Sequence, residues 1–165
     1  MIETVVFTSQ AAIENLIQPD PNTAVISIVG SGCRDTKIKD GFHSVLRLSF
    51  DDLSEETVGW SVGCLPDAAE NGGQLYFEAG RFPNDPVFPD INHAKAITTF
   101  LDELECRHLV VHCHAGVSRS AAVAKFVSVN YGARLVGKNT DVSFANRRLL
   151  RLLDKARCVR AKAGF

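Results

Sequence analysis

The feature that most constrains this chain is the stretch from Leu109 to Ser120, which reads LVVHCHAGVSRS. Its first residues are branched and apolar, which predicts a short buried strand. A loop with one glycine follows, and the next run, AAVAKFV, has the composition of a helix. Cys113 is therefore expected where a strand ends, and Arg119 where a helix begins.

This strand–loop–helix arrangement predicts a site for an anion. A loop that leads into a helix N-terminus directs several backbone N–H groups at one point, and the helix dipole adds partial positive charge there. In such surroundings we expect the pKa of Cys113 to lie well below that of a free cysteine. Arg119 adds a planar group that can bind two oxygens of one phosphate, and Gly116 permits a backbone conformation that other residues resist.

The segment from His112 to Ser120 resembles the Cys-x5-Arg-Ser/Thr signature of the protein tyrosine phosphatase superfamily. Its form is closest to the dual-specificity branch and to the small bacterial and phage relatives of that branch. The resemblance implies a covalent mechanism without metal or cofactor, in which Cys113 attacks phosphorus and Arg119 holds the phosphoryl oxygens. It also implies that Ser120 hydrogen-bonds the thiolate and helps it leave, while His112 supports the cysteine from behind. The residues that would cradle the phosphate are His114, Ala115, Gly116, Val117, Ser118 and Arg119.

Strands and helices alternate along the rest of the chain. Expected strands cover residues 4–7, 24–29 and 42–50; expected helices cover residues 12–17, 91–104, 121–131 and 144 onward, with a loop at 133–141. Ser9 and Asp90 are expected to cap two of these helices. The alternation favours an α/β fold, a three-layer sandwich with a central, mainly parallel sheet flanked by helices. The phosphatase resemblance implies the same architecture and extends loosely from Ala24 to Leu153.

A phosphatase of this kind needs an acid that protonates the leaving group, and several aspartates are candidates for that role. Asp51 and Asp52 follow the strand that ends at Phe50. In a parallel sheet this strand end shares an edge with the Cys113 loop, and small dual-specificity phosphatases carry their acid after a similar strand. We therefore expect Asp52 to be the acid, with Asp51 next. Counting back from Cys113 by the usual family spacing points instead to Asp85.

The segment 56–89, between the expected acid and the next helix, is longer than small relatives usually carry. It contains Trp60 and four of the six prolines. Such a segment is either a hairpin over the sheet edge or a lid over the active site. Within it, Leu65-Pro66-Asp67 resembles the Trp-Pro-Asp loop of larger tyrosine phosphatases, although its surroundings do not.

Composition limits the other classes of function. The 165 residues suit one domain, covering 1–165, and the net charge of −1 gives no sign of a nucleic-acid or membrane-surface binder. No apolar run approaches the roughly 18 residues of a transmembrane helix, and the first residues lack the basic start of a secretory signal. Five widely spaced cysteines, an odd number, indicate a reducing compartment. We therefore expect a cytoplasmic protein, and a monomer.

Other interpretations of the same stretch stay open. A metal site would need His112, Cys113 and His114 to converge, but neighbours along a strand point to opposite faces. A rhodanese-like sulfurtransferase also uses a cysteine in an anion-binding loop, although the Gly-Val-Ser-Arg-Ser run and the upstream Asp52 favour a phosphatase. A phosphate-binding pseudophosphatase would keep the loop and lack the acid.

The residues between Cys113 and Arg119, which we call the signature loop, favour a phosphorylated protein or peptide as the substrate. Lipid phosphatases of the superfamily often carry lysines in this loop, and here there are none. Phosphotyrosine is preferred, with phosphoserine and phosphothreonine as alternatives, and no basic stripe indicates an RNA substrate.

Two further questions stay open from the sequence. Relatives often have Pro-Asn before the last helix; Asn146 matches the asparagine, but Ala145 replaces the proline, so the role of Asn146 is undecided. The second question is whether another cysteine protects Cys113. Ordinary structural cysteines are the default expectation for the other four.

Overall fold

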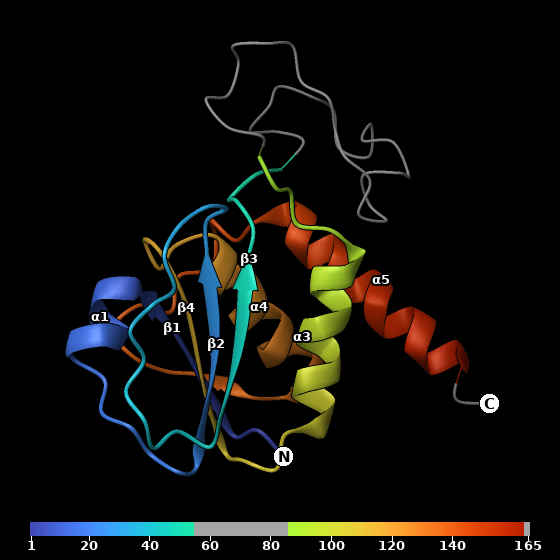
Figure 1. Ribbon diagram of the computed structural model, residues 1–165. Coiled ribbons are helices and arrows are strands. Elements are labelled where there is room, and N and C mark those ends of the chain that lie inside the picture. The colour runs from blue at the N-terminus through green and yellow to red at the C-terminus, as the bar shows by residue number, and fades with distance from the viewer. Residues whose placement is uncertain (55–85, 164–165) are drawn as a thin grey trace.

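The computed structural model describes residues 1–54 and 86–163 (Figure 1). The strands are β1 (Thr4–Ser9), β2 (Thr23–Val29), β3 (Ser44–Ser49), β4 (His108–Cys113) and β5 (Arg134–Leu135). The helices are α1 (Gln10–Asn15), α3 (Ile91–Glu103), α4 (Arg119–Tyr131) and α5 (Arg147–Ala163). All pairs of these strands are parallel, in the order β3-β2-β4-β1-β5. The expected α/β sandwich with a central parallel sheet is thus confirmed.

The burial of each strand reflects its place in the sheet. β2 is buried along its whole length, and β4 is buried after its first residue. Continuous burial of this kind is typical of a central strand that is covered on both faces. β3 lies at one edge, where its residues alternate between half-buried and exposed.

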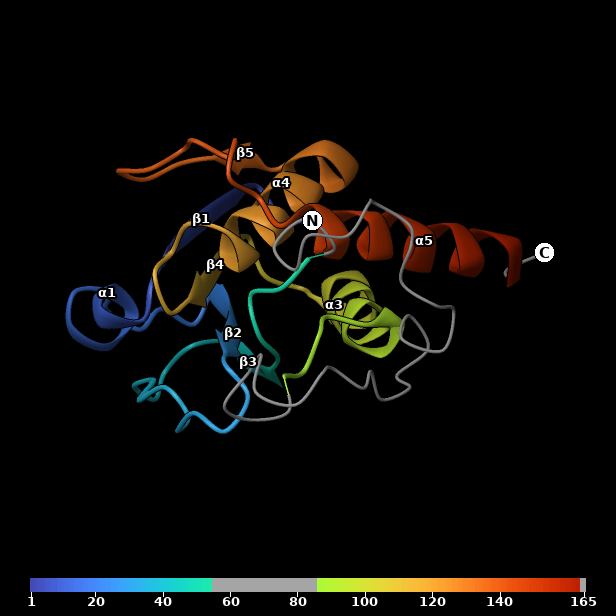
Figure 2. The same ribbon diagram turned by 90° about the horizontal axis from the view of Figure 1, so that it is seen from above.

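Helices cover the two faces of the sheet unequally, as Figure 2 shows. α3, α4 and α5 pack on one face, and α1 lies on the other together with the chain between β2 and β3. The larger core joins Phe7, Ile26 and Val111 from the sheet to Phe126 and Leu149 from the helices. A smaller core beneath α1 contains Ile13, Val25 and Val110.

Local signals set the ends of the helices as expected. Ser9 Oγ accepts a hydrogen bond from the backbone N–H of Ala12 at the start of α1. The Asp90 side chain accepts hydrogen bonds from the N–H groups of the first turn of α3. α4 ends at Gly132, whose φ of 72° is a left-handed conformation that glycine adopts at little cost.

The structure differs from the sequence expectation at several places. α1, expected over 12–17, covers Gln10–Asn15, because Ser9 caps it from the N-terminal side. The loop expected at 133–141 contains β5, a two-residue strand that forms by pairing with the start of β1. The helix expected from residue 144 begins at Arg147, because Asn146 Oδ1 accepts the N–H of Leu149 and caps it. β3 begins at Ser44 and not at Phe42.

Most of the segment 56–89 falls on residues 55–85, which lie outside the described part of the chain. The hairpin and lid interpretations of this segment therefore stay predictions. Within residues 1–54 and 86–163, none of the helices is long and apolar enough to cross a membrane.

The carboxyl ends of the parallel strands meet at one edge of the sheet. Cys113 at the end of β4 lies opposite Ser9 at the end of β1, and Val29 and Ser49 are paired near the ends of β2 and β3. The loops after β3 and β4 therefore come together, at the edge where open α/β sheets bind their ligands. The candidate site lies here.

Candidate active site

Cys113 is the buried end of β4, with only 2% of its surface exposed. Its Sγ lies 3.2 Å from Oγ of Ser120 in the first turn of α4. Burial acts to raise the pKa of the thiol, but hydrogen bonds from Ser120 and from the backbone of Val117, together with the charge of Arg119, lower the pKa below its usual value. The surroundings of Cys113 thus favour a thiolate.

The loop between β4 and α4 is shaped by a glycine. Gly116 has a φ of 73°, and a Cβ on it would lie 2.4 Å from the backbone nitrogen of Ser9 and the carbonyl carbon of Thr8. The loop is also tied to the start of α1, because the N–H of Gln10 donates to the carbonyl of His114 at 3.2 Å. Both the backbone conformation and the close approach to β1 therefore require glycine here.

Arg119 is the first residue of α4 and is 6% exposed. Its Nη1 donates a hydrogen bond to the carbonyl of Phe50 at 2.7 Å, which anchors the guanidinium to the chain after β3. Its Nε is buried and has no hydrogen-bond partner within the described residues. A buried donor without a partner is costly. This N–H is suited to an oxygen of a bound anion.

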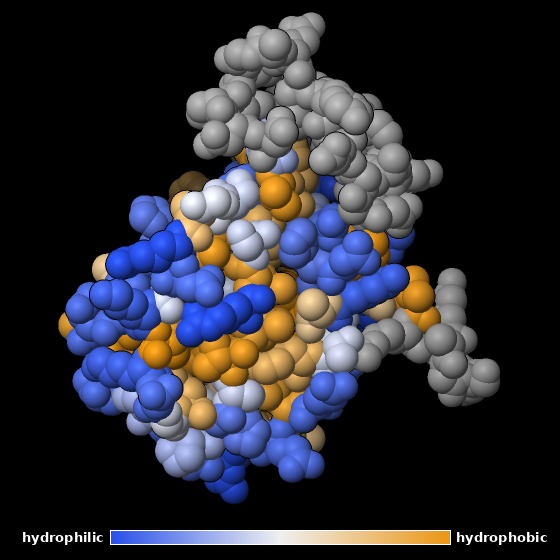
Figure 3. Space-filling model, in the orientation of Figure 1, coloured by the Kyte–Doolittle hydropathy of each residue, from blue (hydrophilic) through white to orange (hydrophobic). Residues whose placement is uncertain are grey.

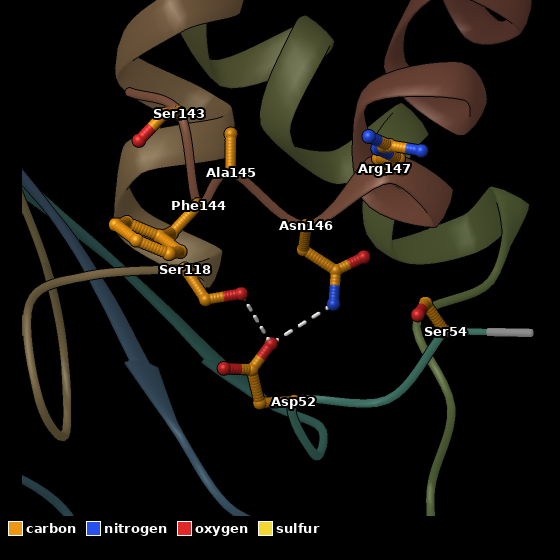
Figure 4. A pocket seen from close by; sticks show the side chains of 8 residues that line it. All are labelled: Asp52, Ser54, Ser118, Ser143, Phe144, Ala145, Asn146 and Arg147. Carbon is orange, nitrogen blue, oxygen red and sulfur yellow. Dashed lines mark hydrogen bonds between the residues drawn. The ribbon is translucent and has the colours of Figure 1, made fainter. Parts of the chain in front are cut away.

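Asp52 lies beside the signature loop, as Figure 4 shows. Its Oδ1 accepts a hydrogen bond from Ser118 Oγ at 2.8 Å and another from Asn146 Nδ2 at 2.9 Å. Ser118 stands at the N-cap of α4 but makes no side-chain capping bond there. Its hydroxyl instead joins the signature loop to the carboxylate.

Asn146 connects three parts of the site. Its Oδ1 accepts the N–H of Leu149 at 3.0 Å, and its Nδ2 donates to Asp52 and, at 3.2 Å, to the carbonyl of Leu53. Its own N–H donates to the carbonyl of Ser118 at 3.2 Å. Asn146 thus positions the start of α5 against both the signature loop and the loop that carries Asp52.

Asp51 is held by a different set of residues. Its carboxylate accepts hydrogen bonds from the N–H and the hydroxyl of Ser31 and, at 2.9 Å, from the N–H of Val87. The N–H of Asp51 donates in turn to the carbonyl of Val87 at 2.7 Å. These contacts give Asp51 a structural role between the loop after β2 and the chain before α3. The rival acids Asp85 and Asp67 lie outside the described residues.

His112 and Cys113 are directed to opposite faces of β4. His112 is fully buried, and its Nε2 lies 2.8 Å from Oγ of Ser27 on β2. Burial lowers the pKa of the imidazole to about 4, so His112 is neutral near pH 7. In the part of the chain that the structure describes, no group of three or more histidine, cysteine, aspartate or glutamate side chains could hold a metal ion.

The four described cysteines are free thiols. Cys106 precedes β4 and so lies toward the opposite edge of the sheet from Cys113, and Cys158 is exposed on α5. Cys33 is exposed and follows β2, so it shares the sheet edge with Cys113. Cys64 falls outside the described residues.

A pocket of about 270 Å³ opens beside Asp52 (Figure 4). The residues that line it are Asp52, Ser54, Ser118, Ser143, Phe144, Ala145, Asn146 and Arg147. Sequence reasoning did not single out Phe144, because an exposed phenylalanine in a loop has no pattern that distinguishes it from a core residue. It also did not find the hydrogen bond from Arg119 to the backbone carbonyl of Phe50. Every residue type has such a carbonyl, so position 50 carries no sequence signal for this contact.

The structure brings Cys113, Arg119, Ser120 and Asp52 together through short hydrogen-bonded links. Three other members of the loop, His114, Ala115 and Val117, form its exposed rim. The arrangement can bind an anion over a nucleophilic sulfur with a carboxylate nearby. Searches against models of known protein families and among curated proteins found no match to this chain.

Proposed function

We propose that this protein is a cysteine-dependent phosphatase of the protein tyrosine phosphatase superfamily, similar to its small dual-specificity members. One observation carries the proposal: a thiol with a lowered pKa, a buried guanidinium with an unpartnered Nε and a carboxylate share one linked site at the sheet edge. Together they supply the nucleophile, the oxyanion ligand and the acid that phosphoryl transfer needs.

In the first step the Cys113 thiolate attacks phosphorus in line with the leaving group. An S–P bond forms, the P–O bond to the leaving group breaks, and the leaving oxygen takes a proton from Asp52. Arg119 and the N–H groups of the loop bind the remaining phosphoryl oxygens, on which the negative charge is spread. The product is an alcohol and a phosphocysteine.

In the second step water attacks the phosphocysteine, and the Asp52 carboxylate takes the proton of the water. The S–P bond breaks and inorganic phosphate is released. The departing sulfur carries negative charge, which the hydroxyl of Ser120, 3.2 Å from Sγ, stabilises by a hydrogen bond. The thiolate and the protonated acid are then ready for another cycle.

The proposed substrate is a phosphorylated protein or peptide, with phosphotyrosine preferred and phosphoserine or phosphothreonine as alternatives. The rim of the signature loop carries histidine, alanine and valine and no lysine, which is poorly suited to a highly charged inositol phosphate. We further propose that the protein is cytoplasmic, in keeping with the free thiols of the described cysteines, and that it is a monomer.

Hydrolysis of p-nitrophenyl phosphate tests the proposal. Turnover should persist in EDTA, be inhibited by vanadate and vanish in Cys113→Ser, whereas the matched variant Cys158→Ser on the exposed face of α5 should retain it. Activity that chelation removes and a divalent metal restores would contradict the proposal, as would turnover by Cys113→Ser. Vanadate binding without turnover would identify a pseudophosphatase, and thiocyanate formed from thiosulfate and cyanide would identify a sulfurtransferase.

A further inference from the structure

Phe144 stands out because its ring is exposed at a pocket. Its exposed fraction is 68%, and within residues 1–54 and 86–163 it is the one phenylalanine with large exposure. The other described phenylalanines are buried or half-buried. A single exposed apolar residue is common on protein surfaces, but Phe144 also lines a pocket, and a pocket wall that combines an aromatic ring with a few polar groups is typical of a small-molecule site.

The exposure of Phe144 does not come from a loose backbone. The next residue, Ala145, is buried and its N–H donates to the carbonyl of Val142 at 3.2 Å. Asn146 is fixed to the signature loop and to α5, and the N–H of Ser143 donates to Asp141 Oδ1 at 2.9 Å. Anchored residues on both sides therefore hold the backbone of Phe144 at the pocket.

The position of the acid indicates which part of a substrate would occupy this pocket. In an in-line displacement the leaving oxygen must lie within hydrogen-bond reach of the group that protonates it. Asp52 borders the pocket, and Figure 4 shows the Phe144 ring beside Ser118, on the far side of the pocket from Ser54. The group attached to the leaving oxygen would therefore extend along Phe144.

We propose that Phe144 is the residue that recognises the aromatic ring of an aryl phosphate such as phosphotyrosine. The inference rests on the proposed phosphatase function. Aromatic rings attract each other in offset or edge-to-face arrangements beyond the effect of the buried area. The shorter alkyl chain of phosphoserine has no ring to offer, so Phe144 would make the enzyme select for aryl esters.

Calorimetric binding to the Cys113→Ser protein tests this inference with two probes, phenyl phosphate and inorganic phosphate. Phe144→Ala should weaken the binding of phenyl phosphate about tenfold, the effect of a lost aromatic pair. It should leave inorganic phosphate unaffected, because that ligand has no leaving group. Phe144→Tyr should restore phenyl phosphate binding, and Val129→Ala, a change at an exposed apolar residue on α4, should alter neither affinity.

The two probes separate failure of this inference from failure of the proposed function. If the Cys113→Ser protein binds neither probe, the phosphatase proposal is wrong and this inference falls with it. If both probes bind and Phe144→Ala weakens neither or weakens both equally, only the role of Phe144 is overturned. In the protein with Cys113, Phe144→Ala should also lower the ratio of kcat/KM for phosphotyrosine over phosphoserine peptides about tenfold.

Discussion

Replacement of Asp52 by asparagine should separate the proposed acid chemistry from the structural contacts of this side chain. Among the described residues, Ser118 and Asn146 donate hydrogen bonds to the side chain of Asp52, and both are accepted by Oδ1. The amide oxygen of an asparagine can accept the same two hydrogen bonds, with its NH₂ group in the place of Oδ2. We therefore expect the variant to keep the network, with a free energy of unfolding within about 0.5 kcal/mol of wild type, and to lose only the proton.

The size of the kinetic effect follows from the loss of general acid catalysis. For a phosphotyrosine peptide, kcat should fall by about 10²- to 10⁴-fold, which corresponds to roughly 2.7–5.4 kcal/mol in the activation barrier. The loss should be smaller for an aryl phosphate whose leaving group is acidic, because that group scarcely needs a proton. The basic limb of the kcat–pH profile should also flatten. Steady-state kinetics over a series of leaving groups measures both effects.

The neighbouring aspartate provides a matched control. Both carboxylate oxygens of Asp51 accept hydrogen bonds, from Ser31 and from Val87. In Asp51→Asn the NH₂ group must face one of these donors, so the free energy of unfolding should fall by about 1–3 kcal/mol with no leaving-group dependence. The assignment of Asp52 would be refuted if Asp52→Asn lowered kcat only slightly while the loss of kcat in Asp85→Asn depended on the leaving group. If none of these aspartates affects turnover, phosphate binding becomes the better interpretation.

Three other changes have clear expected outcomes. Arg119→Lys should lower kcat/KM about 10²- to 10³-fold, because one ammonium cannot replace a planar group that bonds the Phe50 carbonyl and, in the proposed mechanism, also a phosphoryl oxygen; near-normal kinetics would contradict this. Gly116→Ala should destabilise the fold by at least about 1–3 kcal/mol in urea unfolding, since its Cβ would lie 2.4 Å from the nitrogen of Ser9. The pKa of His112 is about 4 in the folded protein against 6.5 ordinarily. Its neutral form therefore adds to the free energy of unfolding above pH 6.5, and this contribution is lost as the pH falls through about 4. The stability difference between wild type and His112→Asn should therefore shrink between about pH 7 and pH 4, and a constant difference would refute the reasoning.

The sequence by itself determines those features of this protein whose residues follow one another along the chain. The strand, the glycine, the arginine and the helix around Cys113 follow one another, so local composition predicts their order and the structure confirms their conformation. The same holds for the capping residues Ser9 and Asp90, whose partners lie within three residues. The alternation of strands and helices likewise predicts the α/β sandwich, because each strand or helix can be recognised from the spacing of its own apolar residues.

Tertiary structure alone decides which residues meet across the fold. Asp51 and Asp52 are adjacent and chemically identical, and they differ only because Ser31 and Val87 bind one while Ser118 and Asn146 bind the other. The anchor of Arg119, the two-residue strand β5 and the pocket beside Phe144 depend in the same way on distant partners. Such contacts form only when the whole sheet and its helices pack, so they leave no local pattern in the sequence.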